Sequence, residues 1–455
     1  MPAYSLENDV LYAERTPIPV AWQGDVIVAG GGPAGLGAAI AAARSGAKTL
    51  LIERHAFLGG MCAFGSGMPL GGAYPSSRTI GGVAEEILQR TAQAGPDSAS
   101  VREMPHFGRW YYHDAEYFKS LAVELVRENG VEVLLHTAVV DAAMDDAVLG
   151  GATIKALIVE NKSGRQAVRA GAYVDCTGDA DVAAYAGAGY EKGRAEDGAM
   201  MAVTLPYILF DVDVQKVLDY QAEDPAFERA RTRAARDGLE LAPTDRWQSC
   251  AAGARPDHLF SNVIRITGVD GTDAAQLTSA EMEARVRVRQ HIAFWRGYIP
   301  GCENAYVGHT SEQMGIRDTR RIVGERRLET SDCLECTKPK DTILRCMGPI
   351  DNVDRGQGSE HIWLDDESDW YGIPYGVMVP VGLDNLLVAG RCFSSSERAQ
   401  SGSRGQGLLM GMGHAAGVAA TWVAARGIRA REVDVPELQA ELTAQGMDLG
   451  LDQLE

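Results

Sequence analysis

Apolar runs and glycine-rich turns alternate at the start of the chain, and this pattern predicts a strand, a helix and a second strand. Residues 25–29 (DVIVA) form a short apolar run that is typical of a buried parallel strand. The small residues at 38–43 continue a helix, and Gly46 stands where a C-terminal helix cap belongs. Residues 48–53 (KTLLIE) predict the second strand. The order of these elements indicates the α/β class.

Later segments add further elements of both kinds. Residues 114–129 carry apolar side chains at helical spacing, and Asp114 is a plausible N-cap for the predicted helix. Residues 131–175 alternate between apolar and polar positions and predict several strands. Two charged helices are predicted within 225–238 and 278–296.

Residues 405–425 contain no Asp, Glu, Lys or Arg, and such a stretch is long enough to span a bilayer. Its content is glycine, alanine and methionine, with Gln406 and His414, rather than leucine, isoleucine and phenylalanine. We therefore predict a helix buried in a globular core, in which His414 packs or caps rather than catalyses.

Composition narrows the class of protein further. A chain of 455 residues should form two or three structural units. The formal net charge of −19 argues against binding to nucleic acid or to an anionic membrane surface. No secretory signal is evident at the N-terminus, and the eight cysteines are scattered apart from Cys333 and Cys336, so we expect a cytoplasmic protein.

The turn after the first strand carries a dinucleotide-binding pattern. Gly30, Gly32 and Gly35 have G-x-G-x-x-G spacing, which permits a tight turn, a close approach of backbone to a pyrophosphate, and close packing of helix on strand. Glu53 ends the second strand 18 residues after Gly35, where a carboxylate accepts hydrogen bonds from a ribose and disfavours a 2′-phosphate.

The remaining segments favour FAD over NAD. Gly59 and Gly60 follow the second strand, and residues 172–183 and 384–394 each run from a predicted strand into a glycine turn. An extended FAD contacts several strand ends of one domain, whereas NAD bound by one Rossmann half does not. A second glycine fingerprint is missing, so no separate NAD domain is evident.

These segments also resemble a known family. The chain is similar to the FAD-dependent oxidoreductases through "GGGPAG", "VDCTGDADVAAYAGAGYEKGR", "GIRDTRRIVGE", "YGIPYGVMVP" and "NLLVAGRCFSS", over roughly residues 24–428. Within that family it resembles the glutathione-reductase-like flavoproteins, near the fumarate reductase and tricarballylate dehydrogenase flavoproteins. The resemblance implies a Rossmann-like FAD-binding domain of the glutathione reductase type with an inserted mixed α+β substrate domain. The predicted segments are 20–200 and 373–430 for the FAD-binding domain, 201–372 for the substrate domain, and 431–455 for a C-terminal tail or helix.

The resemblance also implies cofactor-binding residues. Val139 should face the adenine through its backbone, Asp179 should lie on the pyrophosphate or ribityl side, and residues 405–410 should approach the flavin N1 and O2. The full predicted set is Gly30, Gly32, Pro33, Ala34, Gly35, Glu53, Arg54, Gly60, Met61, Cys62, Val139, Gly178, Asp179, Gly390, Arg391, Gly405, Leu408, Leu409 and Met410. The chain departs from the common family pattern at Cys62–Ala63, at Glu397 and at 404–407, all expected near the flavin ring.

Four residues are candidates for catalysis. Glu397, on a loop before the flavin-proximal turn, is the candidate base, or else a surface carboxylate. Arg317 and Arg404 are suited to clamp a carboxylate or a developing enolate, or else to join an ion-pair network with Asp318 and Glu325. His309 is a candidate acid, base or ligand anchor, or else a structural histidine.

The cysteines leave two alternatives open. Cys62 is either a redox group or flavin tether beside the ring, or a small buried side chain. Cys333, Cys336 and Cys346 are either unpaired thiols or a redox pair, and they are one short of a structural zinc set, so no metal is predicted.

Together these features predict an FAD-dependent dehydrogenase or oxidase that transfers a hydride from a small organic substrate, carboxylate- or carbonyl-bearing, to flavin N5. The alternatives are an NAD(P)H-dependent flavin reductase or hydroxylase and a flavin electron-transfer subunit. A homo-oligomer is possible, and neither nucleic acid nor a membrane is an expected partner.

Overall fold

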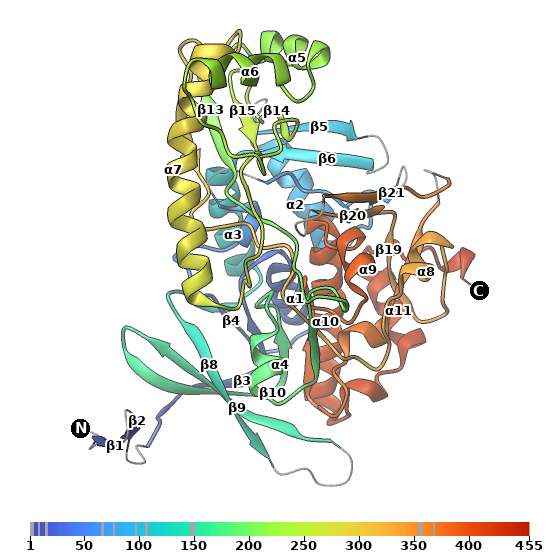
Figure 1. Cartoon of the computed structure of the whole chain (residues 1–455). Helices are drawn as coiled ribbons and strands as arrows, with labels where there is room; N and C mark the ends of the chain where they lie inside the picture. The colour runs from blue at the N-terminus through green and yellow to red at the C-terminus, as the bar shows by residue number, and fades with distance from the viewer. Residues whose placement is uncertain are drawn as a thin grey trace.

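A computed structural model describes residues 4–7, 10–13, 17–64, 68–75, 78–95, 98–104, 108–145, 151–353, 358–366 and 369–454 (Figure 1). The predicted strand, turn, helix and strand near the N-terminus are confirmed as β3 (Val20–Ala29), α1 (Pro33–Arg44) and β4 (Thr49–Ile52). Gly30 has a φ of 100°, and a Cβ at Gly35 would lie 1.8 Å from the carbonyl oxygen of Gly30. The turn therefore tolerates only glycine at these two positions.

A mostly parallel sheet forms the centre of the larger core. Five strands run parallel in the order β7 (Glu132–Leu134), β4, β3, β10 (Gly164–Asp175) and β23 (Leu386–Val388). β9 (Thr153–Asn161) and β8 (Ala138–Asp145) extend the sheet antiparallel beyond β10. The structure confirms a mixed α/β fold with a parallel sheet, in which segments distant in sequence end at one edge.

Helix α10 (Gln406–Arg426) lies beside α1 against this sheet (Figure 1). It is the one helix of the described chain that is long and apolar enough to cross a membrane, with a mean hydropathy of 1.4, yet 83% of its apolar window is buried inside the protein. Its His414 is buried, with Nε2 2.8 Å from Gln445 Oε1. As predicted, the helix belongs to the protein core.

A second hydrophobic core draws its residues from Val203 to Met314. The antiparallel sheet of β14 (Cys250–Ala252), β15 (Leu259–Ser261), β13 (Tyr207–Phe210) and β17 (Tyr306–Thr310) forms one wall. Three helices pack with it, namely α5 (Val214–Glu223), α6 (Glu228–Arg236) and α7 (Ala274–Tyr298), the long helix at the left of Figure 1.

The larger hydrophobic core includes residues on both sides of position 372, the predicted end of the substrate domain. Buried residues from Leu328 to Val379, such as Leu344 and Tyr371, belong to the larger core. The reason is that β19 (Thr342–Cys346) and β22 (Tyr371–Pro374) pair with each other, and β19 lies against α10.

Several local predictions are confirmed. The helix over 114–129 is α3 (Ala115–Glu128), where the Asp114 carboxylate accepts from the backbone N–H groups of Glu116 and Tyr117. The predicted C-terminal segment contains α11 (Val435–Ala444). Five helices were not predicted, namely α2 (Gly82–Gln93), α4 (Asp181–Tyr185), α5, α8 (Thr330–Leu334) and α9 (Glu397–Gly402).

The close packing of α1 on α10 depends on glycines. A Cβ at Gly413 would lie 1.9 Å from the Ala34 carbonyl oxygen, and one at Gly37 would lie 2.1 Å from that of Met410.

We expect Gly413→Ala to lower the free energy of unfolding by about 1–3 kcal/mol, because the helices must separate. Gly297→Ala is the matched control, since Gly297 lies in α7 with no atom within 4 Å of the added Cβ. Chemical denaturation checks both, and equal stability of the two variants would contradict the proposed tight contact.

Candidate functional site

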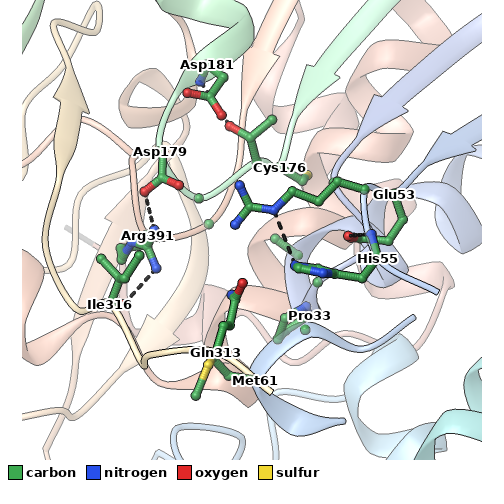
Figure 2. Close-up of a pocket in the computed structure, with 18 of the residues that line it drawn as sticks. Pro33, Glu53, His55, Met61, Cys176, Asp179, Asp181, Gln313, Ile316 and Arg391 are labelled. Atoms are coloured by element: carbon green, nitrogen blue, oxygen red, sulfur yellow. Dashed lines mark hydrogen bonds and ion pairs between the residues drawn. The ribbon is translucent and has the colours of Figure 1, made fainter. Parts of the chain in front are cut away.

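A cavity of about 480 Å³ opens where the parallel strands end (Figure 2). Its wall includes Gly30 after β3, Glu53 after β4, Cys176 after β10 and Gly390 after β23. Ligands of open α/β sheets bind outside the carboxyl ends of the strands, and this cavity has that position.

At one end of the cavity the wall is suited to a ribose and a base. Glu53 is buried, and its carboxylate accepts from the backbone N–H groups of Gly31 at 2.7 Å and His55 at 2.8 Å. Residues 137–140, around the predicted adenine contact Val139, line the same end with Tyr185. Both Glu53 oxygens hold the turn and keep acceptor capacity for a ribose hydroxyl.

The start of α1 fits a pyrophosphate. Gly32 is the N-cap, and the helix has no side-chain cap hydrogen bond and no acidic residue in its first turn. A Cβ at Gly32 would meet no atom within 4 Å, and Gly32 lines the cavity, so the space beside it is open to a ligand. Helix N-terminal N–H groups and the helix dipole both favour an anion at such a place.

Asp179 and Arg391 form an ion pair at the cavity wall (Figure 2). Arg391 Nη2 lies 2.5 Å from Asp179 Oδ1, and Arg391 Nη1 donates to the Ile316 carbonyl at 2.7 Å. Thr319 donates to the same Asp179 oxygen at 2.8 Å. The pair therefore ties the ends of β10 and β23 to the loop that leaves the second core.

The opposite end of the cavity is walled by arginines and the start of α10. Arg317, Arg404, Gln406 and Leu409 line it, together with Thr204 from the second core. Gln400 of α9 is fully buried and donates to the backbone carbonyls of Arg317 and Arg391, at 2.9 and 3.3 Å. Gln400 thus fixes two cavity-lining arginines, although no sequence signal marked it.

Most of the predicted cofactor-binding residues line this one cavity. These are Gly30, Gly32, Pro33, Ala34, Glu53, Arg54, Gly60, Met61, Val139, Gly178, Asp179, Gly390, Arg391 and Leu409. Gly35, Cys62, Gly405, Leu408 and Met410 are not among the lining residues. Gly35 instead packs against Gly30, and Leu408 and Met410 are buried in the core.

Two of the four candidate catalytic residues lie elsewhere. Glu397 is not on a loop but on the first turn of α9, where it is half-buried and outside the cavity lining, because Ser396 caps this helix. His309 is an exposed residue of β17 that lines a second cavity of about 370 Å³, with its ring 5.5 Å from that of Phe210. The structure does not bring Glu397 or His309 to Arg317 and Arg404.

Sequence reasoning missed the contribution of the second core and its exit loop. Thr204, Gln313, Gly315 and Ile316 all line the cavity, and Gln313 lies across from His55 (Figure 2). These residues carry no local motif, since their position depends on how the two cores pack together. His55 was also missed as a cavity-lining residue, although its place directly after Glu53 and Arg54 could have indicated that it lines the site.

The fold and the cavity are those of a protein that binds an extended dinucleotide along a parallel sheet. The cavity is lined by glycine turns, by the open start of α1 and by the Glu53 carboxylate, which is suited to a ribose. Residues 25–442 match the family described as FAD dependent oxidoreductase. The chain belongs to this family, and it is an FAD-dependent oxidoreductase enzyme whose cofactor is FAD.

Individual relatives are more distant. A curated relative, the thiamine thiazole synthase of Aeropyrum pernix, is 45% identical over 64 residues, which are 14% of this chain and span only 22% of that enzyme. A geranylgeranyl bacteriochlorophyll reductase-like protein of Thermoplasma acidophilum is 13% identical with a TM-score of 0.44, over 93% of this chain and 83% of its own. The p-nitrophenol 4-monooxygenase of Pseudomonas putida is 13% identical with a TM-score of 0.43, over 93% and 88%. The narrower resemblance to fumarate reductase and tricarballylate dehydrogenase flavoproteins stays a prediction.

We expect Gly32→Val to abolish FAD retention without unfolding the protein. The added side chain would enter the open space at the start of α1, where we expect the pyrophosphate to bind. Bound flavin absorbance after gel filtration measures retention, and far-UV circular dichroism checks the fold. A variant that keeps a full complement of FAD would contradict this location of the pyrophosphate.

The cysteines are all free, and only Cys336 is not buried. Burial raises the pKa of Cys62 well above its usual value, and the thiol donates to Gln406 Oε1 at 2.7 Å. Cys333, Cys336 and Cys346 do not line the cavity.

We expect iodoacetamide at neutral pH to modify Cys336 first and to leave the buried Cys62 intact in the folded protein, since the thiolate is the reactive form. Peptide mass spectrometry, with the denatured protein as control, reads this out, and early modification of Cys62 would disprove it.

Proposed function

We propose that this enzyme is a dehydrogenase or oxidase that removes a hydride from a small organic substrate. When bound, FAD supplies the hydride acceptor, its N5 atom. The observation that carries the proposal is one continuous cavity. It is lined by Glu53, whose carboxylate is suited to a ribose, by the start of α1, and by Arg317 and Arg404. The end lined by these arginines lies between the two cores and is suited to a substrate.

The chain's own residues would perform three tasks. Arg317 and Arg404 would orient a polar group of the substrate by hydrogen bonds from their guanidinium groups. The N-terminus of α10, which lines the cavity through Gln406 and Leu409, would place the positive end of a helix dipole against negative charge. Apolar side chains of the cavity wall, among them Met68 and Leu409, would exclude water.

We also propose that the FAD-binding core is of the glutathione reductase type and that the enzyme is cytoplasmic. The first proposal is supported by the parallel strands from distant segments and by the antiparallel extension β8–β9. The second is supported by eight free cysteines.

The test is anaerobic reduction of the holoenzyme. Small alcohols, amines and hydroxy acids are mixed with it, each with hydrogen or deuterium at the reacting carbon. At least one class should bleach the flavin, more slowly with deuterium, because the C–H bond breaks in that step. NADH and NADPH should leave the flavin oxidised. Rapid bleaching by NADH or NADPH, with none by any organic substrate, would instead support the reductase or hydroxylase alternative.

A further inference from the structure

Arg317 is a buried cation at the cavity wall. It is 9% exposed, and it lines the cavity beside Arg404 and Thr204. Its guanidinium has five N–H donors, and within the described part of the chain the Ala202 carbonyl, at 2.8 Å, is its one hydrogen-bond acceptor. Because burying a charge without partners is costly, its remaining donors need an acceptor.

The surroundings of Arg317 add positive charge. Burial, followed by the charges of Arg265 and Arg404, lowers the pKa of Arg317 well below its usual value. Arg265 is itself only 5% exposed, and Arg246 contributes in the same direction. A neutral substrate would leave this field in place, whereas an anion would relieve it.

The acidic group that pairs with Arg404 is engaged on both sides. Asp351 binds Arg404 at 3.1 Å and His361 at 3.1 Å. Burial opposes ionisation of Asp351, but the hydrogen bond from His361 and the charge of Arg404 outweigh it and lower the pKa to about 2. Asp351 is therefore a fixed carboxylate that supports Arg404.

Buried hydrogen bonds hold the backbone around this cluster. The Asp245 carboxylate accepts from the backbone N–H of Arg265 at 3.2 Å and pairs with His291 at 2.7 Å. Tyr207 OH lies 2.9 Å from the other His291 nitrogen, and all three of these side chains are buried in the second core. Gln400 holds the backbone of Arg317 from the opposite side. Such a preformed site gives up little conformational entropy on binding.

We propose that the arginine end of the cavity binds a carboxylate group of the substrate, and that Arg317 is the residue that anchors it. The substrate class is therefore a small organic acid whose reacting carbon is held next to the flavin. The inference rests on the proposed function, since it names the substrate of that same site. A planar guanidinium pairs with a carboxylate through two parallel hydrogen bonds, and apolar side chains that line the same cavity, such as Leu409 and Met68, suit a carbon chain.

The first experiment uses the unmodified holoenzyme. Acetate, malonate, succinate and citrate are titrated at constant ionic strength, each beside its neutral amide, and inorganic phosphate is titrated in parallel. Flavin absorbance and thermal denaturation both report binding. At least one carboxylate should perturb the flavin spectrum and raise the melting temperature, and its amide should do neither. Equal binding of acid and amide would overturn the proposal, and so would tighter binding of phosphate than of every carboxylate.

The second experiment tests the assigned residue. Arg317→Met should raise the Kd of the best carboxylate about 10–100-fold, the usual loss for a charge-assisted hydrogen bond, and Arg317→Lys should give a smaller loss. Arg326→Met is the matched control. Arg326 is outside the cavity lining, and within the described segments Asp332, at 3.9 Å, is its one ion-pair partner. An unchanged Kd in Arg317→Met or Arg317→Lys would overturn the assignment.

Failure of this inference is distinguishable from failure of the proposed function. The titrations measure binding to the oxidised holoenzyme and need no turnover. An enzyme that oxidises neutral compounds and ignores carboxylates would retain the proposed function and refute this inference. An enzyme that binds carboxylates tightly and is never reduced by any organic compound would refute the proposed function alone.

Discussion

The backbones of α1 and α10 touch, and this contact brings two helix starts to one cavity. Gly413 lies against the Ala34 carbonyl, Gly417 against the Ala38 carbonyl and Gly37 against that of Met410. Any side chain at these positions would push the helices apart. The start of α1 would then no longer face the same ligand as the start of α10. The distance between the pyrophosphate end and the arginine end of the site is set by this contact.

A second constraint joins the sheet to the substrate side. Asp179 and Arg391 follow two neighbouring parallel strands, and Arg391 also holds the backbone of Ile316. Gln400 then connects Arg391 with Arg317 through their carbonyls. Residues from three distant segments, at 179, 316–317 and 391–400, are thus held in one network, and Arg317 owes its position to the same groups that shape the cofactor site.

The sequence predicted those parts of the site that are determined locally. The glycine turn, the first helix and Glu53 follow from residue spacing within about thirty residues, because a strand, a tight turn and a helix start fix each other's geometry. Arg317 and Arg404 were found by residue type alone. Glu397 was placed on a loop because nothing nearby showed that Ser396 begins a helix, and His309 lies on a strand that faces another cavity. The domain limit at 372 failed to anticipate that Leu344 and Tyr371 pack with the larger core, since core membership depends on contacts with α10.

The discontinuous origin of the site has a consequence for biosynthesis. Helix α1 emerges from the ribosome early, whereas its packing partner α10 begins only at Gln406. At about 5–20 residues per second, translation separates the two helices by roughly 20–70 s. Throughout that interval the nascent chain presents an alanine- and glycine-rich helical face with nothing to cover it, and no complete receptor for the prosthetic group exists. FAD therefore binds only after synthesis of the chain is nearly complete. A chain truncated before α10 should be bound by chaperones or degraded by proteases.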